Sequence, residues 1–204
     1  MGGPKAVEGF ALAVALDETE WLTRARTGDA AAFEAIYQRY ERRIYSFVYR
    51  LMGNAEDASD LTQETFVKAY MALPRAQGEM NLSAWLHRIA SNACLDVLRR
   101  RRLIQWMPWD VFTTNPGLEP AAPDDPAGSF VRHETSEEVQ QLLNKLSPKH
   151  RLALILKEYQ GLSCDEIAEV MHTSRSAVKS LLFRAREEFR QVAAREGSTL
   201  RTNR

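Results

Sequence analysis

The sequence predicts an all-α protein in which two small helical domains are joined by a flexible acidic linker. Three observations support this fold class. Apolar residues recur at helical spacing in several separate blocks, and no stretch alternates convincingly as a strand would. Five of the eight prolines lie between Leu103 and Val131, and that stretch carries four acidic residues but no Lys or Arg. A Pro-rich acidic segment without periodicity is typical of a linker, so two domains are favoured over one.

Before the prolines, three segments show the apolar spacing of helices. The first is "DAAAFEAIYQRYERRIYSFVYRLMG", after which Gly53 and Asn54 mark a break. The second is "DASDLTQETFVKAYMAL", which we expect to end at Pro74. The third is "NLSAWLHRIASNACLDVLRRRR", whose apolar stripe ends close to a run of four arginines.

The second of these helices has an acidic outer face. Its polar residues are Asp60, Gln63, Glu64 and Lys68, and we expect the buried side to consist of Leu61, Phe66, Val67 and Tyr70. An acidic face does not suit DNA, but it suits a basic protein surface. Periodicity alone favours an ordinary solvated face.

After the linker, "ETSEEVQQLLNKL" predicts another helix. Ser147 followed by Pro148 is a typical helix start, and the helix "KHRLALILKEYQ" is expected to stop at Gly161. We place the boundaries as an N-terminal arm at 1–20, a first domain at 21–102, the linker at 103–133, a second domain at 134–196 and a tail at 197–204.

The stretch "SCDEIAEVMHTSRSAVKSLLFRARE" predicts a helix-turn-helix. Ser163 and Glu166 have the spacing of a capping box, and the turn "HTS" requires His172 or Thr173 to accept any left-handed conformation. Val178, Leu182 and Ala185 give the second helix a buried stripe. Its outer face is polar and basic, which suits the major groove of DNA. The alternative is an ordinary helical hairpin with a solvated face.

A second basic surface follows from the helix that ends in four arginines. Arg88, Asn92 and Arg99 are spaced by four and seven residues and therefore share one face, which suits phosphates and base edges. Trp85 offers a ring that could stack on a base, although a core position beside Leu86 is the alternative. The arginine run is also compatible with a solvated helix end.

Composition excludes several classes of protein. The net charge is zero, and the two cysteines, Cys94 and Cys164, form neither a disulfide framework nor a zinc spacing. No apolar run is long enough to cross a membrane, and the N-terminus lacks the features of a signal peptide. An enzyme would have to use Cys94 with His87 or Cys164 with His172, and neither pair has an evident orienting group. We expect no catalytic residue, metal or cofactor.

Four motifs in series resemble the extracytoplasmic-function group of bacterial sigma factors, over about Trp21 to Ala193. They are "GDAAAFEAIYQRY", "DLTQETFVKAYMAL", "WLHRIASNACLDVLRRRR" and "LSCDEIAEVMHTSRSAVKSLLFRARE". The resemblance implies a cytoplasmic factor that binds core RNA polymerase and directs it to promoters. It implies docking of Asp60, Gln63 and Glu64 on the clamp helices of the largest subunit, a contact with the flap of the second subunit, and an anti-sigma factor as a further partner.

The resemblance also assigns promoter DNA to the two basic surfaces. It implies that the first domain binds the single-stranded −10 element through Ala76, Gln77, Trp85, Arg88, Asn92 and Arg99. It implies that the helix-turn-helix reads the duplex −35 element through Ser174, Arg175, Ser176, Lys179, Ser180, Phe183 and Arg184, with packing as the alternative for Phe183. It places the acidic linker in the active-site cleft of the polymerase. A stand-alone helix-turn-helix regulator is the closest competing interpretation, and it leaves the first domain unexplained.

Overall fold

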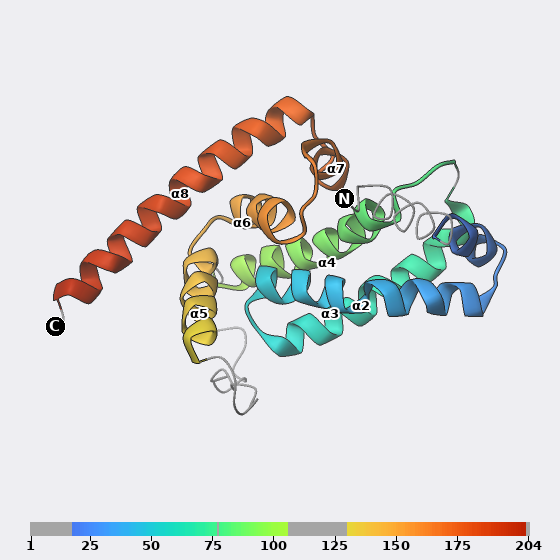
Figure 1. Ribbon diagram of the computed structural model, residues 1–204, viewed down its shortest axis with the longest axis horizontal. Coiled ribbons are helices and arrows are strands. Elements are labelled where there is room, and N and C mark those ends of the chain that lie inside the picture. The colour runs from blue at the N-terminus through green and yellow to red at the C-terminus, as the bar shows by residue number, and fades with distance from the viewer. Residues whose placement is uncertain (1–17, 77, 106–129, 203–204) are drawn as a thin grey trace, which may run out of the picture.

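The computed structural model describes residues 18–76, 78–105 and 130–202. This part of the chain contains helices and turns but no strand, and it forms two helical domains, which confirms the predicted fold class (Figure 1). The N-terminal arm to residue 17, Gln77, the centre of the predicted linker and the last two residues lie outside the described residues.

The first domain is a bundle of three long helices preceded by a short helix over residues 18–26. The long helices are α2 (Ala30–Met52), α3 (Ala55–Ala72) and α4 (Leu82–Gln105), with a 3₁₀ turn, η1 (Leu73–Arg75), after α3. The apolar stripes of all three meet in one core, in which Ile36, Phe47, Leu73 and Leu86 are almost fully buried. An edge-to-face contact joins Tyr37 of α2 to Phe66 of α3, with 4.8 Å between the two ring centroids.

Short polar residues set the helix boundaries of this domain. The Asp29 carboxylate accepts hydrogen bonds from the backbone amides of Ala31 and Ala32 and so starts α2. Gly53, at φ 84°, ends α2 in the left-handed conformation that glycine adopts without steric cost. The side chain of Asn54 then caps α3. The turn at Gly53 and Asn54 reverses the chain so that α3 packs against α2.

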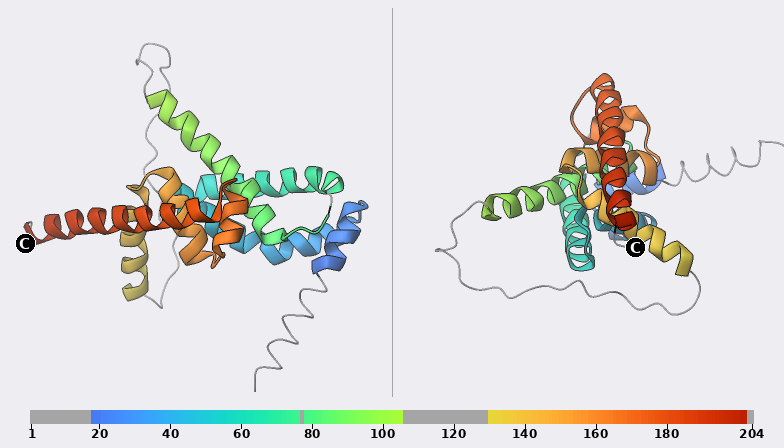
Figure 2. Two further views of the ribbon diagram at one scale, coloured as in Figure 1. Left: turned by 90° about the horizontal axis from the view of Figure 1, so that it is seen from above. Right: turned by 90° about the vertical axis from the view of Figure 1, so that its left-hand side faces the viewer.

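The second domain contains α5 (Phe130–Asn144), α6 (Pro148–Leu154), a π-helical turn η3 (Ile155–Tyr159), α7 (Cys164–Val170) and α8 (Arg175–Thr202). The predicted starts are confirmed: Ser147 caps α6 with Pro148 in its first turn, and Ser163 and Glu166 form a capping box at α7. His172 adopts the left-handed conformation at φ 48°, as the short turn requires. The C-terminal half of α8 extends beyond the other helices (Figures 1 and 2).

Three expectations need correction. Val67 and Tyr70 of α3 are 58% and 49% exposed rather than buried, because the core covers only the side of α3 that carries Leu61, Phe66 and Ala69. The helix predicted to run unbroken to Gly161 changes to a π-helical turn over its last residues. Helical residues also continue to Gln105 and begin again at Phe130, inside the segment assigned to the linker. The domain boundaries themselves stay a prediction.

The two domains pack against each other. Helix α7 lies against α4, and α5 and η3 lie against α2. Several hydrogen bonds cross this junction, among them one from Arg151 to the backbone carbonyl of Leu51 at 2.8 Å. The second domain therefore has a defined position over the first.

Candidate nucleic-acid interface

The first candidate surface is the start of α8. Val178, Leu182 and Ala185 are buried in the same core as Ile167 and Val170 of α7, so the helix is held along its inner side. At its start, the Ser174 hydroxyl accepts a hydrogen bond from the backbone amide of Ala177 at 3.2 Å. Because one side is fixed in this way, the opposite side projects outward as a rigid surface.

That outward side contains the residues that the sequence predicted. All of them are exposed: Ser174, Arg175, Ser176, Lys179, Ser180, Phe183 and Arg184. Phe183 is 70% exposed, so it is not a packing residue. Arg175 has a long ion pair of 3.4 Å with Asp165, and Arg184 bonds only to the carbonyl of Ser180 within the described residues. The surface therefore offers cations with few competing partners, beside one exposed aromatic ring.

The second candidate surface is one side of α4. Trp85, Arg88, Asn92 and Arg99 follow each other at helical spacing; Asn92 and Arg99 are exposed, and Arg88 is partly buried. Arg99 forms an ion pair with Asp96 at 2.8 Å. Trp85 is only 8% exposed, so its ring is largely a packing element with one edge accessible.

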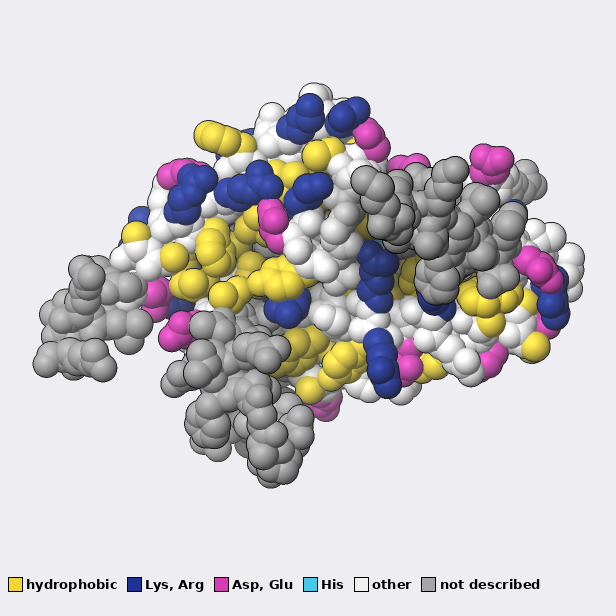
Figure 3. All heavy atoms as spheres, viewed as in Figure 1, with side chains coloured by type: hydrophobic (Ala, Val, Ile, Leu, Met, Phe, Trp, Pro, Cys, Tyr) yellow, Lys and Arg dark blue, Asp and Glu magenta, His cyan; other side chains and the backbone are white. Residues whose placement is uncertain are grey.

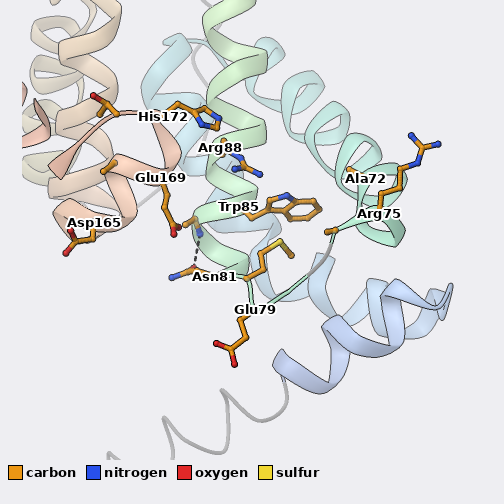
Figure 4. Close-up of a pocket in the computed structure, with 14 residues that line it drawn as sticks. Ala72, Arg75, Glu79, Asn81, Trp85, Arg88, Asp165, Glu169 and His172 are labelled. Carbon is orange, nitrogen blue, oxygen red and sulfur yellow. Dashed lines mark hydrogen bonds between the residues drawn. The ribbon is translucent and has the colours of Figure 1, made fainter.

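This side of α4 opens into a pocket of about 820 Å³ between the two domains (Figure 4). Trp85, Arg88 and the partly buried Ala76 line the wall formed by the first domain. Asp165, Glu169 and other residues from α7 and the turn after it line the opposite wall. The predicted −10 residues Trp85 and Arg88 therefore face an acidic helix of the second domain in this structure.

The third surface is the outer face of α3. Asp60, Gln63 and Glu64 are exposed there, and Glu64 forms an ion pair with Lys68 at 2.5 Å. Val67 and Met71, which is 71% exposed, follow on the same side of the helix. The sequence analysis placed Val67 on the buried side and did not consider Met71, although their spacing of seven and eleven from Asp60 was a usable signal. Exposed apolar groups beside acidic ones are typical of a protein-binding face.

Of the two cysteine and histidine pairs considered for catalysis, Cys94 and His87 are buried, whereas Cys164 is partly buried and His172 is exposed. Cys94 is fully buried, and this burial raises the pKa of its thiol to about 12, which keeps it protonated. His87 is also fully buried; burial lowers its pKa, and its Nδ1 lies 2.7 Å from the carbonyl of Ser83. Neither Cys94 nor His87 is accessible to a substrate. No cluster of His, Cys, Asp or Glu suited to a metal ion occurs within the described residues.

Comparison with known families identifies two segments of the chain. Residues 36–104 match Sigma-70 region 2, and residues 136–189 match Sigma-70 region 4. The ECF RNA polymerase sigma factor SigW of Bacillus subtilis is 32% identical over 178 residues, which cover 83% of this chain and 93% of SigW. The chain belongs to the extracytoplasmic-function (ECF) sigma factors of the sigma-70 family. This ECF sigma factor carries the second basic surface, α4, in region 2 and the helix-turn-helix in region 4.

Solved structures share the fold of this ECF sigma factor. CnrH in complex with the cytosolic domain of CnrY superposes with a TM-score of 0.66 at 24% identity, over 87% of this chain and 97% of CnrH. RpoE in complex with the anti-sigma factor NepR from Bartonella quintana superposes with a TM-score of 0.60 at 25% identity, over 79% of this chain and 96% of RpoE. The sigma factor therefore acts in transcription initiation through a known two-domain helical fold.

Proposed function

We propose that this sigma factor binds core RNA polymerase, directs it to promoters by reading a duplex −35 element and a single-stranded −10 element, and promotes DNA melting. The observation that carries the proposal is the outward side of α8, which is basic, exposed and rigidly held. The neutral net charge of the chain fits this role, because promoter binding then depends on tethering both surfaces to the polymerase.

The start of α8 is proposed to read the −35 duplex. Arg175, Lys179 and Arg184 can reach guanine edges or phosphates, while Ser176 and Ser180 are short enough to let the helix approach the groove. Phe183, whose ring has no cover within the described part of the chain, suits an apolar contact with a thymine methyl group.

The side of α4 is proposed to hold the unpaired −10 strand. Asn92 presents an exposed amide for a base edge, and Arg88 and Arg99 present guanidinium groups for the strand. The accessible edge of Trp85, with Ala76 and Gln77 in the preceding loop, would border the captured base; Gln77 lies outside the described residues. Trapping bases that have left the stack offsets the cost of melting, which is a few kcal/mol per base.

Two further surfaces are proposed to bind core polymerase. The face of α3 with Asp60, Gln63 and Glu64, extended by Val67 and Met71, suits the clamp helices. An apolar groove of about 390 Å³ lies between α5, the end of α6, η3 and α8 and suits the flap of the second subunit (Figure 3). Its lining includes Val139, Leu143, Leu154, Tyr159 and Phe189.

The remaining expectations follow from the family. We propose that an anti-sigma factor controls this chain, because RpoE is seen with the anti-sigma factor NepR. We also propose a cytoplasmic location and no catalytic activity, because the function described needs only binding. No helix in the described part of the chain is both long and apolar enough to cross a membrane.

Run-off transcription tests the proposed function. Purified core RNA polymerase is mixed with the full chain and a library of genomic fragments, and the 5′ ends of the RNA are sequenced. The expected result is a set of core-dependent start sites that share two spaced upstream motifs. A stand-alone regulator would instead give no new starts and would bind duplex DNA tightly without core polymerase.

A further inference from the structure

The C-terminal half of α4 projects beyond the rest of the first domain (Figure 2). Within the described residues, Cys94 is the last side chain of α4 that the core buries, and Val97 and Leu98 are only partly buried. Arg99, which is proposed to hold the promoter strand, lies in this thinly packed half. Apolar packing alone therefore gives this part of the helix little support.

An ion pair between Arg101 of α4 and Asp57 of α3 supplies further support. The two terminal nitrogens of the Arg101 guanidinium, Nη1 and Nη2, donate to the two carboxylate oxygens of Asp57, each at 2.7 Å. A forked contact of this kind fixes direction as well as distance. Asp57 lies in the first turn of α3, so the pair joins the start of α3 to the projecting half of α4.

The cap of α3 holds the Asp57 carboxylate in place for this contact. The Asn54 side chain accepts from the backbone amide of Asp57 at 2.8 Å and donates to its carboxylate. Burial would raise the pKa of Asp57, but hydrogen bonds from Arg101 and Asn54, with the charge of Arg101, outweigh burial and lower it below the ordinary value of 3.8. With a side chain only 18% exposed, this carboxylate is ionised at neutral pH and oriented before Arg101 meets it.

Arg101 lies on the opposite side of α4 from the residues proposed to bind DNA. It follows the buried Cys94 by seven residues, so both share the side of α4 that faces α3. Asn92 and Arg99 precede it by nine and two residues, which places both about half a turn around the helix from Arg101. Arg101 therefore supports α4 from behind while Asn92 and Arg99 face outward.

Helix α3 carries the proposed polymerase-binding face together with Asp57. Asp60 follows Asp57 by three residues, and Gln63 and Glu64 lie one turn further on. These three are exposed, whereas Asp57 is partly buried beneath them against α4. When polymerase holds α3 by its exposed face, the ion pair carries that fixed position over to the projecting half of α4.

We propose that Asp57 and Arg101 are positioning residues that fix the projecting half of α4 on α3, so that Asn92 and Arg99 meet the unpaired promoter strand when α3 is docked on core polymerase. This role rests on the function proposed above for α3 and α4. It assigns Arg101 to the support of α4 and not to DNA, although Arg101 belongs to a run of four arginines.

Substitution of Asp57 separates this role from a direct contact between Arg101 and DNA. If Arg101 bound phosphates, Asp57→Asn would free its guanidinium and remove a repelling charge, and melting would stay the same or increase. If Asp57 positions α4, the same change should lower melting by about fivefold. Arg101→Lys gives a second, milder comparison, because lysine keeps the charge but cannot make the forked contact. It should also lower melting.

The experiment is a double-mutant cycle in the full chain with core polymerase. It uses Asp57→Asn, Arg101→Gln and the double variant, on a promoter found by run-off transcription. Permanganate reactivity at saturating holoenzyme measures melting, and fluorescence anisotropy of the labelled chain measures affinity for core polymerase. Each single variant should lose about fivefold in melting with unchanged core affinity. The double variant should lose no more than either one, because both changes break the same contact.

The matched control is a second cycle that pairs Asp57→Asn with Arg100→Gln. Arg100 is the exposed neighbour of Arg101 and has no partner among the described residues. Its substitution removes the same charge without touching Asp57, so the effects of the two changes should multiply. Circular dichroism and thermal unfolding verify that every variant folds, and Arg101→Lys provides the comparison at a half-exposed side chain if Asp57→Asn does not fold.

Full melting by folded Asp57→Asn, or by Arg101→Lys where that comparison is used, would overturn the positioning role. Losses that multiply in the double variant would give Arg101 a DNA contact of its own, and an equal loss of core affinity would place the effect in α3 alone. Both results also contradict the proposal. Failure of the function proposed above is distinct, because the wild-type chain would then give no core-dependent start sites, whereas failure of the positioning role leaves the wild-type chain active.

Discussion

The start of α8 and the side of α4 carry similar chemistry in opposite surroundings. Both present arginines with short polar side chains at helical spacing. The α8 surface projects from its support, and Lys179 and Phe183 are exposed. The α4 surface is exposed at Asn92 but enters a pocket at Trp85 and Arg88, where α7 stands opposite. The two proposed promoter-reading surfaces are therefore not equally available in the free chain.

This difference has a simple physical meaning. A duplex is stable before the protein arrives, so a surface that reads it can remain exposed. A single strand exists only after melting, so a surface that binds it is needed later.

The largest effect is expected at the exposed surface. Lys179→Ala/Arg184→Ala should lower run-off transcription by about 100-fold, because each lost base or phosphate contact costs about 1–2 kcal/mol and a factor of ten corresponds to 1.4 kcal/mol. Both side chains are exposed, so the fold should be retained. The control is Lys149→Ala on α6, which removes an exposed cation of the same domain outside α8. A similar loss in the control would show that general positive charge, and not the start of α8, is what matters.

A smaller effect is expected on the third surface, which is proposed to bind core polymerase. Met71→Asp should weaken binding of core polymerase by about 20-fold, because it places a charge in the centre of an apolar contact. Met71 is 71% exposed, so the change should not disturb folding. The control is Ser59→Asp, which adds the same charge to another exposed side of α3. Fluorescence anisotropy of the labelled chain measures the affinity for core polymerase. An equal loss of affinity in Met71→Asp and Ser59→Asp would show that Met71 does not lie in the contact.

Sequence patterns predicted the local structure of these surfaces well. The caps at Ser147 and Ser163, and the left-handed residue at His172, are local rules that need only a few neighbouring residues. Val67 and Tyr70 were placed wrongly because helical periodicity locates an apolar stripe but does not reveal how much of it a neighbouring helix covers.

The contacts between the two domains could not be predicted from the sequence for a different reason. Arg43 and Gln160 are 117 residues apart, and their meeting depends on a π-helical turn that no sequence rule specified. Arg151 reads as an ordinary basic residue near a helix start, whereas in the structure it is buried against α2. Interactions between domains depend on the positions of whole helices, and single-sequence patterns do not contain these positions.

An effect of about tenfold is expected from Asn92→Ala on the α4 surface. The variant should reduce open-complex formation on a complete promoter, since it removes one hydrogen-bonding group for an unpaired base at a cost of about 1.4 kcal/mol. It should leave unchanged the binding of polymerase holoenzyme to a fragment that contains only the upstream duplex element. Permanganate footprinting measures melting, and a filter-binding assay measures the fragment. Equal losses on both DNAs would remove the proposed division between the surfaces.

The smallest effect concerns Glu166 of α7, which accepts a hydrogen bond from Asn81 of the first domain at 2.9 Å. Burial alone would raise the pKa of this carboxyl, but hydrogen bonds from Ser163 and Asn81, with the nearby charge of Arg43, outweigh burial and lower it below the ordinary value of 4.5. A lowered pKa means that the folded chain binds this proton less readily than the unfolded chain does. The stabilisation is therefore fully present above the ordinary pKa and is lost as pH falls through the lower, folded value.

Glu166→Gln isolates this contribution because glutamine keeps the capping box and cannot titrate. The wild-type chain should be more stable than the variant by about 0.5 kcal/mol near pH 7, the size of a partly exposed charge interaction. The difference should vanish at a pH well below 4.5, where Glu166 is protonated. Thermal unfolding of both chains across this range measures it. A difference that persists when the carboxyl is neutral would assign the effect to shape rather than charge, and Glu166 would then hold α7 against α4 by packing alone.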